Sequence, residues 1–331
     1  MTGISKQSDK QAERIVAGVP EGLDALVLGQ LVAEAKSDEG PGTVLHVARD
    51  DRRLDALERA LAFFAPDVRI IAFPAWDTVP YDRVGPNAEI VARRITALAK
   101  LSLTRRKHPT VVLTTVNAVL QRVPPRSFLK RAIKQVAPGQ RVDMGRLTKR
   151  LSLMGYVRSG TVMEPGEYAV RGGIVDLYAP GADAPVRLDF FGDTLESIRP
   201  FDPETQRTTG QQPRLDLVPM SEVVIGPDVV TRFRTAYRES FGAPARDDLL
   251  YTSVSEGRRH PGIEHWLPLV HDHLDTLLAY TPCAVAFLAH LADGTLRYLL
   301  TEVAHHFQAR RAGFAPGQRG LPHHPIEPIT P

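Results

Sequence analysis

Hydrophobic and polar residues alternate between two periods in the first third of the chain. Three segments have apolar residues at helical spacing, and short, nearly continuous apolar runs stand between them. Such runs are typical of parallel strands that helices cover on both faces. The expected helices are 25–35, 52–64 and 88–103, and the expected strands are 43–48, 68–73 and 110–115. This order predicts βαβ units, with Asp50-Asp51 and Asn87 at the expected helix N-caps.

The pattern changes to short strands after Pro124-Pro125 and stays so to about Pro213. Residues 174–178 form an apolar run with a single acid, and 186–191 alternates charged and apolar residues. The next two residues, Gly192-Asp193, are typical of a hairpin turn. We therefore expect a small domain of paired strands to interrupt the α/β lobe.

Strict alternation in the run 186–191 separates its side chains into two groups. Arg187 and Asp189 fall on one face with Phe191, and Phe190 falls on the other with Leu188. Either a bulge or an exposed edge turns Phe190 outward, or Phe190 belongs to the core and only the charged residues face a partner.

Later segments return to α/β character. They comprise 217–224, helices at 229–240 and 262–278, and a buried strand at 284–288, and a proline-rich and glycine-rich tail starts at Arg310. The expected domains are 1–124 (first part of the lobe), 125–212 (inserted β-rich domain), 213–309 (return segment of the lobe) and 310–331 (linker or frayed tail).

The stretch from Gly155 to Thr208 carries a family resemblance. Its motifs are Arg171-Gly172 followed by the strand that ends at Tyr178, then Arg187-Leu-Asp-Phe-Phe, then Phe201-Asp-Pro-Glu-Thr. They resemble the small domain shared by the UvrB excision-repair helicase and the bacterial transcription-repair coupling factors (Mfd). In that family the domain docks the UvrA damage sensor, so the resemblance implies UvrA as the partner.

A second block favours the coupling factors over UvrB. Residues 73–82, with Trp76 at their centre, resemble the UvrB-like module of the coupling factors, and only about a dozen residues separate Trp76 from the helix expected at Ala88. The long hairpin with which UvrB probes DNA does not fit there. The resemblance implies a RecA-like parallel-sheet lobe with a degenerate P-loop, and the family's RNA polymerase-binding and DNA translocase domains are absent from this chain, which we expect to be a fragment or a truncated relative.

The resemblance also implies which residues contact UvrA. Aligned without gaps, the family's contact positions are Arg158, Arg171, Arg187, Asp189 and Phe190, while a further family arginine is replaced by Ala169. A guanidinium binds carboxylates through a planar pair of donors, which suits protein recognition. The alternative is that these charges form salt bridges inside a small β domain, and Asp176 and Asp189, each flanked by an arginine, fit ion pairing better than acid–base chemistry.

Nucleotide hydrolysis is not expected. A Walker A loop needs a lysine and a hydroxyl that hold phosphate and Mg²⁺. The matching segment, residues 18–24, lacks both, and Glu21 and Asp24 would repel phosphate. The chain is therefore expected to be a non-catalytic adaptor; the alternatives are a UvrB-type DNA-stimulated ATPase and a direct DNA-binding module.

Composition changes this picture little. The 331 residues carry 41 basic and 38 acidic side chains, and this near balance argues against a dedicated nucleic-acid binder. Between Arg126 and Arg150, however, the sequence has eight basic residues and a single acid, Asp143. This cluster is either a solvated helix face or a patch that binds phosphate or an acidic partner. The single cysteine, Cys283, predicts no disulfide and fits a cytoplasmic location. The histidines are scattered and form no metal-binding motif, so neither a metal site nor a cofactor is expected. No apolar stretch is long enough to predict membrane insertion.

Overall fold

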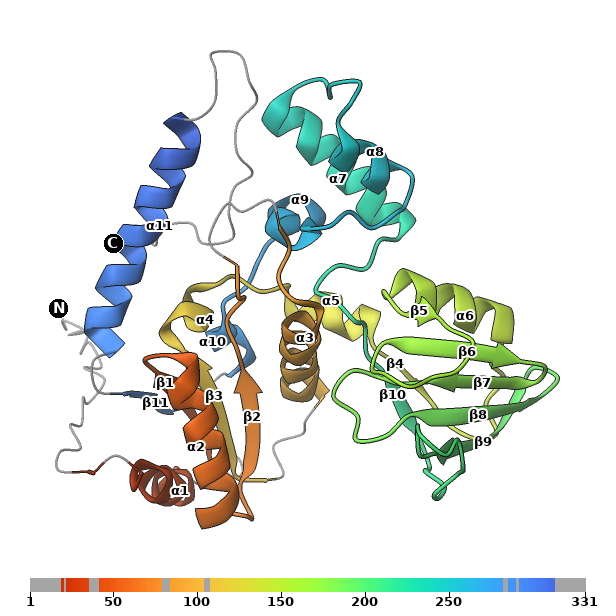
Figure 1. Cartoon of the computed structure of the whole chain (residues 1–331), viewed down its shortest axis with the longest axis horizontal. Coiled ribbons are helices and arrows are strands. Elements are labelled where there is room, and N and C mark those ends of the chain that lie inside the picture. The colour runs from red at the N-terminus through yellow and green to blue at the C-terminus, as the bar shows by residue number, and fades with distance from the viewer. Residues whose placement is uncertain are drawn as a thin grey trace, which may run out of the picture.

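The computed structural model describes residues 19–20, 22–35, 42–78, 84–103, 108–281, 285–289 and 292–312. Figure 1 shows an α/β lobe at one end of the molecule and a β-rich domain at the other, with helices of the return segment above and between them. The predicted α/β fold with an inserted β-rich domain is confirmed.

The lobe is built on a parallel sheet. Its strands are β1 (Thr43–Ala48), β2 (Arg69–Phe73), β3 (Thr110–Thr115) and β11 (Val285–Leu288), in the order β11-β1-β3-β2. Every residue of β3 is buried, as its apolar run predicted, because helices lie on both faces of a parallel sheet. The strand expected near 284–288 pairs with β1, so the chain does return to the sheet after the β-rich domain.

Helices cover both faces of this sheet. They are α1 (Asp24–Glu34), α2 (Asp51–Phe64), α3 (Ala88–Leu103), α4 (Val116–Leu120) and α5 (Arg126–Ala132). Successive residues of β3 point to opposite faces, so Val111 packs in the core under α1 and α2, whereas Val112 packs in the core under α3, α4 and α5. The side chain of Asp50 accepts a hydrogen bond from the Arg53 amide at 2.8 Å and caps α2.

The β-rich domain has its own core. Its elements are β4 (Lys134–Val136), α6 (Met144–Leu153), β5 (Val157–Arg158), β6 (Glu167–Arg171), β7 (Ile174–Leu177), β8 (Val186–Phe191), β9 (Thr194–Pro200) and β10 (Leu215–Leu217). The main sheet has the order β5-β6-β7-β8-β9, and β10 pairs with β4 in a separate antiparallel ribbon. Apolar residues of α6 and of both sheets, such as Leu151, Leu188 and Leu217, meet in one buried cluster.

The packing of the cores suggests where this domain begins and ends. Phe128 and Leu129 of α5 belong to the core of the lobe, although they follow the boundary expected at 125. Leu215 and Leu217 of β10 belong to the core of the β-rich domain, although they follow the boundary expected at 212. We therefore propose that the β-rich domain runs from the start of β4 to the end of β10.

The return segment consists mainly of helices: α7 (Pro227–Phe241), α8 (Leu249–Ser255), the 3₁₀ helix η1 (Ile263–Trp266), α9 (Leu267–Val270), α10 (Leu277–Tyr280) and α11 (Ala292–Ala312). The prediction of one helix over 262–278 is wrong. The chain starts there with a 3₁₀ turn, Pro268 lies in the first turn of α9, and His271 is extended, so the helix ends at Val270. The last turn of α11 enters the tail expected from Arg310, and residues 313–331 lie outside the described residues.

Candidate protein-interaction site

The five residues expected to contact UvrA all lie on the main sheet of the β-rich domain. Arg158 is on the edge strand β5, Arg171 ends β6, and Arg187, Asp189 and Phe190 are on β8. Two strands separate β5 from β8, so the structure does not gather the five side chains at one point. It divides them into a group held by internal contacts and a group left exposed.

Arg187 is bound inside the domain. Its Nε and Nη2 donate to the two carboxylate oxygens of Asp176 at 2.8 and 2.9 Å, and Asp176 on β7 is 1% exposed. The guanidinium also lies over the ring of Phe201, 4.9 Å from its centroid. The hydrogen bonds to Asp176 raise the pKa of Arg187, and burial opposes this shift only in part. A partner can reach this side chain only at its outer edge.

Asp189 is also held from within. Burial would raise its pKa, but Arg199 donates to its two oxygens at 2.8 and 2.7 Å and Ser197 donates as well, and these bonds hold the pKa below its usual value. Both donors lie on the neighbouring strand β9. The sequence analysis missed Arg199, although its position in an alternating strand was a usable signal.

The two adjacent phenylalanines of β8 point to opposite sides. Phe190 is partly buried against the core of the β-rich domain, whereas Phe191 is 77% exposed beside the hairpin turn. A bulge is present, but Asp189 pairs with Ser197 and Phe190 with Leu195, so the extra residue lies on β9 and the alternation of β8 is undisturbed. Of the two arrangements left open by the sequence, the structure shows the one in which Phe190 turns inward and packs against the core.

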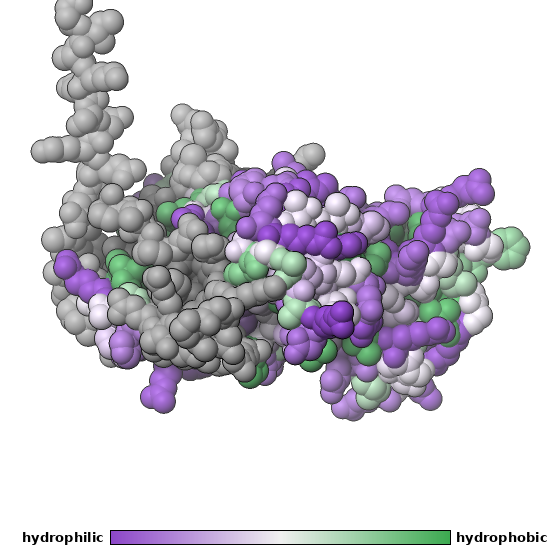
Figure 2. Space-filling view, turned by 90° about the horizontal axis from the view of Figure 1, so that it is seen from above, coloured by the Kyte–Doolittle hydropathy of each residue, from purple (hydrophilic) through white to green (hydrophobic). Residues whose placement is uncertain are grey.

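Arg158 and Arg171 form the exposed group. Arg171 donates through Nη2 to the Gly160 carbonyl at 3.0 Å, which brings it to the segment directly after Arg158. This contact leaves most of the exposed guanidinium open to a partner. Figure 2 shows that hydrophilic side chains cover much of the visible surface of the β-rich end. The exposed face of this domain therefore has a cationic side and, at the β8–β9 turn, an aromatic residue in Phe191.

The segment that resembles a P-loop has a different arrangement. Asp24 opens α1 and forms an ion pair with Arg53 of α2, while Gly22 has φ +104° in the preceding turn. The helix start that would face a phosphate thus presents a carboxylate to a neighbouring arginine. Gly18 and Glu21 lie outside the described residues.

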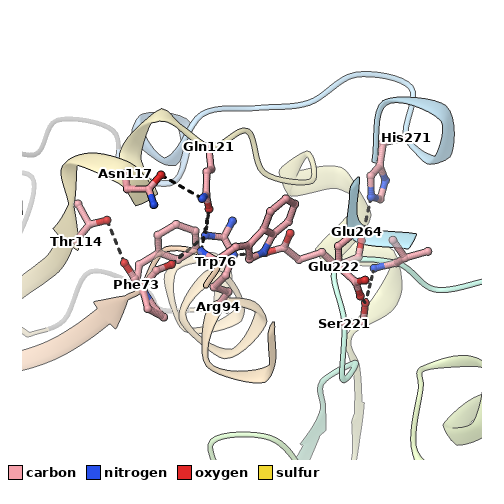
Figure 3. A network of polar contacts seen from close by, with 12 residues as sticks. Phe73, Trp76, Arg94, Thr114, Asn117, Gln121, Ser221, Glu222, Glu264 and His271 are labelled. Carbon is pink, nitrogen blue, oxygen red and sulfur yellow. Dashed lines mark hydrogen bonds and ion pairs between the residues drawn. The ribbon is translucent and has the colours of Figure 1, made fainter. Parts of the chain in front are cut away.

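A buried polar network joins the lobe to the segment that follows β10 (Figure 3). Arg94 of α3 is 0% exposed and donates to Glu222 at 2.7 Å, to the Pro74 carbonyl at 2.9 Å and to Gln121 at 2.8 Å. Its guanidinium also lies over the rings of Phe73 and Trp76, 4.3 and 5.0 Å from the centroids. Burial raises the pKa of Glu222, and Arg94 opposes that shift.

The network continues on the far side of Glu222. His271 shares a hydrogen bond of 2.9 Å with the Glu222 carbonyl, while Ser221 accepts from Arg259 and donates to Glu264. The segment 221–222 is therefore fixed between α3 and the return segment. Sequence reasoning missed this network, although a signal existed: Arg94 stands within the apolar stripe of α3, where a charged residue needs a partner.

Among the residues that the structure describes, no cluster of three or more histidine, cysteine, aspartate or glutamate side chains could hold a metal ion. Within the same residues, no helix has the length and apolar character needed to cross a membrane.

Comparison with known proteins agrees with the geometry. Residues 135–222 match the family described as the UvrB interaction domain. The transcription-repair-coupling factor of Haemophilus influenzae is 33% identical over 276 residues, 83% of this chain and 23% of that protein. The Escherichia coli factor is 34% identical over 78% of this chain and 22% of that protein, and the Myxococcus xanthus factor is 40% identical over 58% and 16%.

The chain thus spans about a fifth of the length of the curated relatives that it matches. The match to the interaction domain ends at Glu222, the residue that Arg94 binds. The fold, the domain match and the relatives agree with the resemblance read from the sequence: the chain belongs to the transcription-repair-coupling factor family and contains its UvrB-like part.

Proposed function

We propose that this chain is a non-catalytic adaptor that docks UvrA through the β-rich domain. The proposed surface keeps the expected set of Arg158, Arg171, Arg187, Asp189 and Phe190, but gives its members different roles. Arg158 and Arg171 contact UvrA directly, because both are exposed. The other three residues, Arg187, Asp189 and Phe190, stabilise the sheet that presents these two arginines. Phe191 is added as an exposed aromatic contact.

The observation that carries this proposal is the pair of exposed arginines within the segment that matches an interaction domain. Arginine and aromatic side chains are enriched among the residues that contribute most to protein interfaces. The sheet holds Arg158 and Arg171 on a rigid framework. Two acids of this sheet, Asp176 and Asp189, are already neutralised by internal arginines. Neither Asp176 nor Asp189 would therefore compete with a carboxylate of UvrA for Arg158 or Arg171.

We infer further that the lobe does not hydrolyse ATP. The ion pair of Asp24 with Arg53 occupies the helix start where a Walker A loop would hold phosphate, and neither the lysine nor the hydroxyl of that motif is present. Turnover above background, with or without DNA, that is abolished by substitution of Gly22 would contradict this inference.

In this proposal the adaptor works in transcription-coupled excision repair in the cytoplasm. It would bring UvrA to a stalled RNA polymerase, while contacts with polymerase and DNA would be made by the parts of the longer relatives that this chain does not span. The proposal needs neither a cofactor nor a metal ion.

The test is the affinity of the full chain for UvrA, measured by calorimetry for the wild type and for Arg171→Ala. Truncating one side of a desolvated charge pair typically costs about 2 to 5 kcal/mol, so the dissociation constant should rise at least about tenfold. The control Arg122→Ala, outside the β-rich domain, should change it little. A wild-type chain that does not bind UvrA would refute the proposal, and an unchanged affinity for Arg171→Ala and Arg158→Ala would refute the assignment of the surface.

A further inference from the structure

A groove lies between α6 and the first two strands of the main sheet. Its volume is about 370 Å³. Lys149 of α6 and Arg158 of β5 line it from the helix and from the sheet edge, Val170 of β6 supplies an aliphatic surface, and Tyr168 lies largely buried at the base. Ser152 of α6 and the Tyr168 hydroxyl share a hydrogen bond of 2.9 Å, which ties the helix to the sheet beside the groove.

The groove is positively charged. Lys149 and Arg158 are exposed, neither forms an ion pair with the described residues, and no acidic residue lines the groove. The nearby acids are engaged elsewhere: Asp143 accepts from the Arg146 amide at 2.6 Å, and Glu167 accepts from two backbone amides at 2.7 and 3.0 Å. The two cations are therefore available to an incoming anion.

We propose that this groove binds an acidic segment of UvrA, a further contact that rests on the docking function proposed above. An aspartate or glutamate side chain of that segment lies between Lys149 and Arg158, and an aliphatic neighbour packs on Val170, which is partly exposed. The apolar lining favours a peptide over a nucleic-acid backbone, because a phosphate chain is bound by cations and gains nothing from an aliphatic surface. The interface then includes α6, which the family alignment of contact positions does not.

The first test reverses the charge of one wall. Lys149→Glu places a carboxylate opposite the proposed acid, and like charges brought together across an interface weaken it strongly. The dissociation constant for UvrA should rise at least about tenfold, and removal of the charge in Lys149→Ala should raise it by a smaller factor. The matched control is Arg146→Glu, the same kind of change on an exposed residue of the same helix outside the groove.

The second test fills the groove without a change of charge. Thr148 lines the groove and is half-buried, so Thr148→Phe should obstruct the segment and weaken UvrA binding. A melting temperature equal to that of the wild type establishes that each variant is folded. Backbone amides of 149–153 should also gain protection from hydrogen exchange when UvrA is added to the wild type.

The outcomes separate the two proposals. In one outcome the wild type binds UvrA and Arg171→Ala weakens that binding, while Lys149→Glu and Thr148→Phe bind as the wild type does. In that case the proposed role of the groove is wrong and the docking function stands. Equal losses of UvrA affinity in Lys149→Glu and Arg146→Glu would indicate long-range electrostatic attraction and would overturn the proposed role of the groove. A loss of affinity for a short DNA duplex in Lys149→Glu, with UvrA binding unchanged, would assign the groove to nucleic acid and also overturn the proposal.

Discussion

The lobe and the β-rich domain use arginine in opposite ways. In the lobe, Arg94 is fully buried and its bonds to Glu222, Gln121 and Pro74 hold three segments together. In the β-rich domain, Arg171 is exposed and donates hydrogen bonds to a carbonyl and a threonine hydroxyl of the neighbouring loop. The same side chain is a structural link in one region and an available donor in the other.

This contrast shows that burial and partner geometry decide what an arginine does. A buried guanidinium loses its hydration and is tolerated only with bonds such as those of Arg94. An exposed guanidinium keeps its hydration until a partner displaces it, so it contributes little to folding and much to recognition. Arg187 lies between these limits, because it neutralises a buried acid and is still 16% exposed.

The largest effect is expected at the buried link. Arg94→Met leaves the Glu222 carboxyl buried without its cation, and breaking such a pair typically costs about 3 to 5 kcal/mol. The free energy of unfolding, measured by urea denaturation, should fall by this amount. The double variant Arg94→Met with Glu222→Leu should recover part of the loss, since it removes both charges. Wild-type stability in Arg94→Met would show that the link is dispensable.

Arg187→Ala should have the next largest effect. It leaves Asp176 almost fully buried with no cation, so we expect a loss of about 2 to 3 kcal/mol in the free energy of unfolding. Arg171→Ala is the control, because an exposed side chain usually changes stability by less than about 0.5 kcal/mol. Similar losses for both variants would remove the distinction between an internal and an exposed arginine in this domain.

Acid should weaken the same buried region through His271. Burial lowers the pKa of His271 to about 4, from 6.5 when unfolded, so between these values the unfolded chain binds the extra proton. The contribution of neutral His271 to the free energy of unfolding is therefore fully present above about pH 6.5. It is lost progressively on acidification, by about 2 kcal/mol at pH 5. The melting temperature should drop from pH 7 to pH 5, and less so in His271→Leu. An equal drop in both would exclude His271 as a cause.

The two phenylalanines of β8 should respond to truncation in opposite ways. Phe190→Ala removes a partly buried ring and should cost about 1 to 3 kcal/mol of stability. Phe191→Ala should change stability by less than about 0.5 kcal/mol and should weaken binding to UvrA instead. The opposite assignment of the two losses would mean that the alternation of β8 does not decide which ring is available.

Local patterns predicted the fold better than they predicted the site. Strand β3 was predictable because a continuous apolar run has few alternatives to a buried parallel strand. The role of Arg187 was not predictable in the same way. Its partner depends on the register between β7 and β8, and no tight turn joins these strands and fixes that register. The bond from Arg94 to Glu222 spans 128 positions of sequence, and periodicity carries no information about such a pair.

The position of Glu222 makes the two parts of the chain unequal when they are produced separately. A fragment that carries the whole interaction-domain match, residues 135–222, extends past β10 and would take Glu222 with it into water, where a carboxylate is well solvated. The remaining lobe would keep Arg94 inside its core with no acid opposite. Excision should therefore yield a soluble interaction domain and a damaged remainder, so that a gene fusion of this domain to another protein is feasible where its deletion from this one is not.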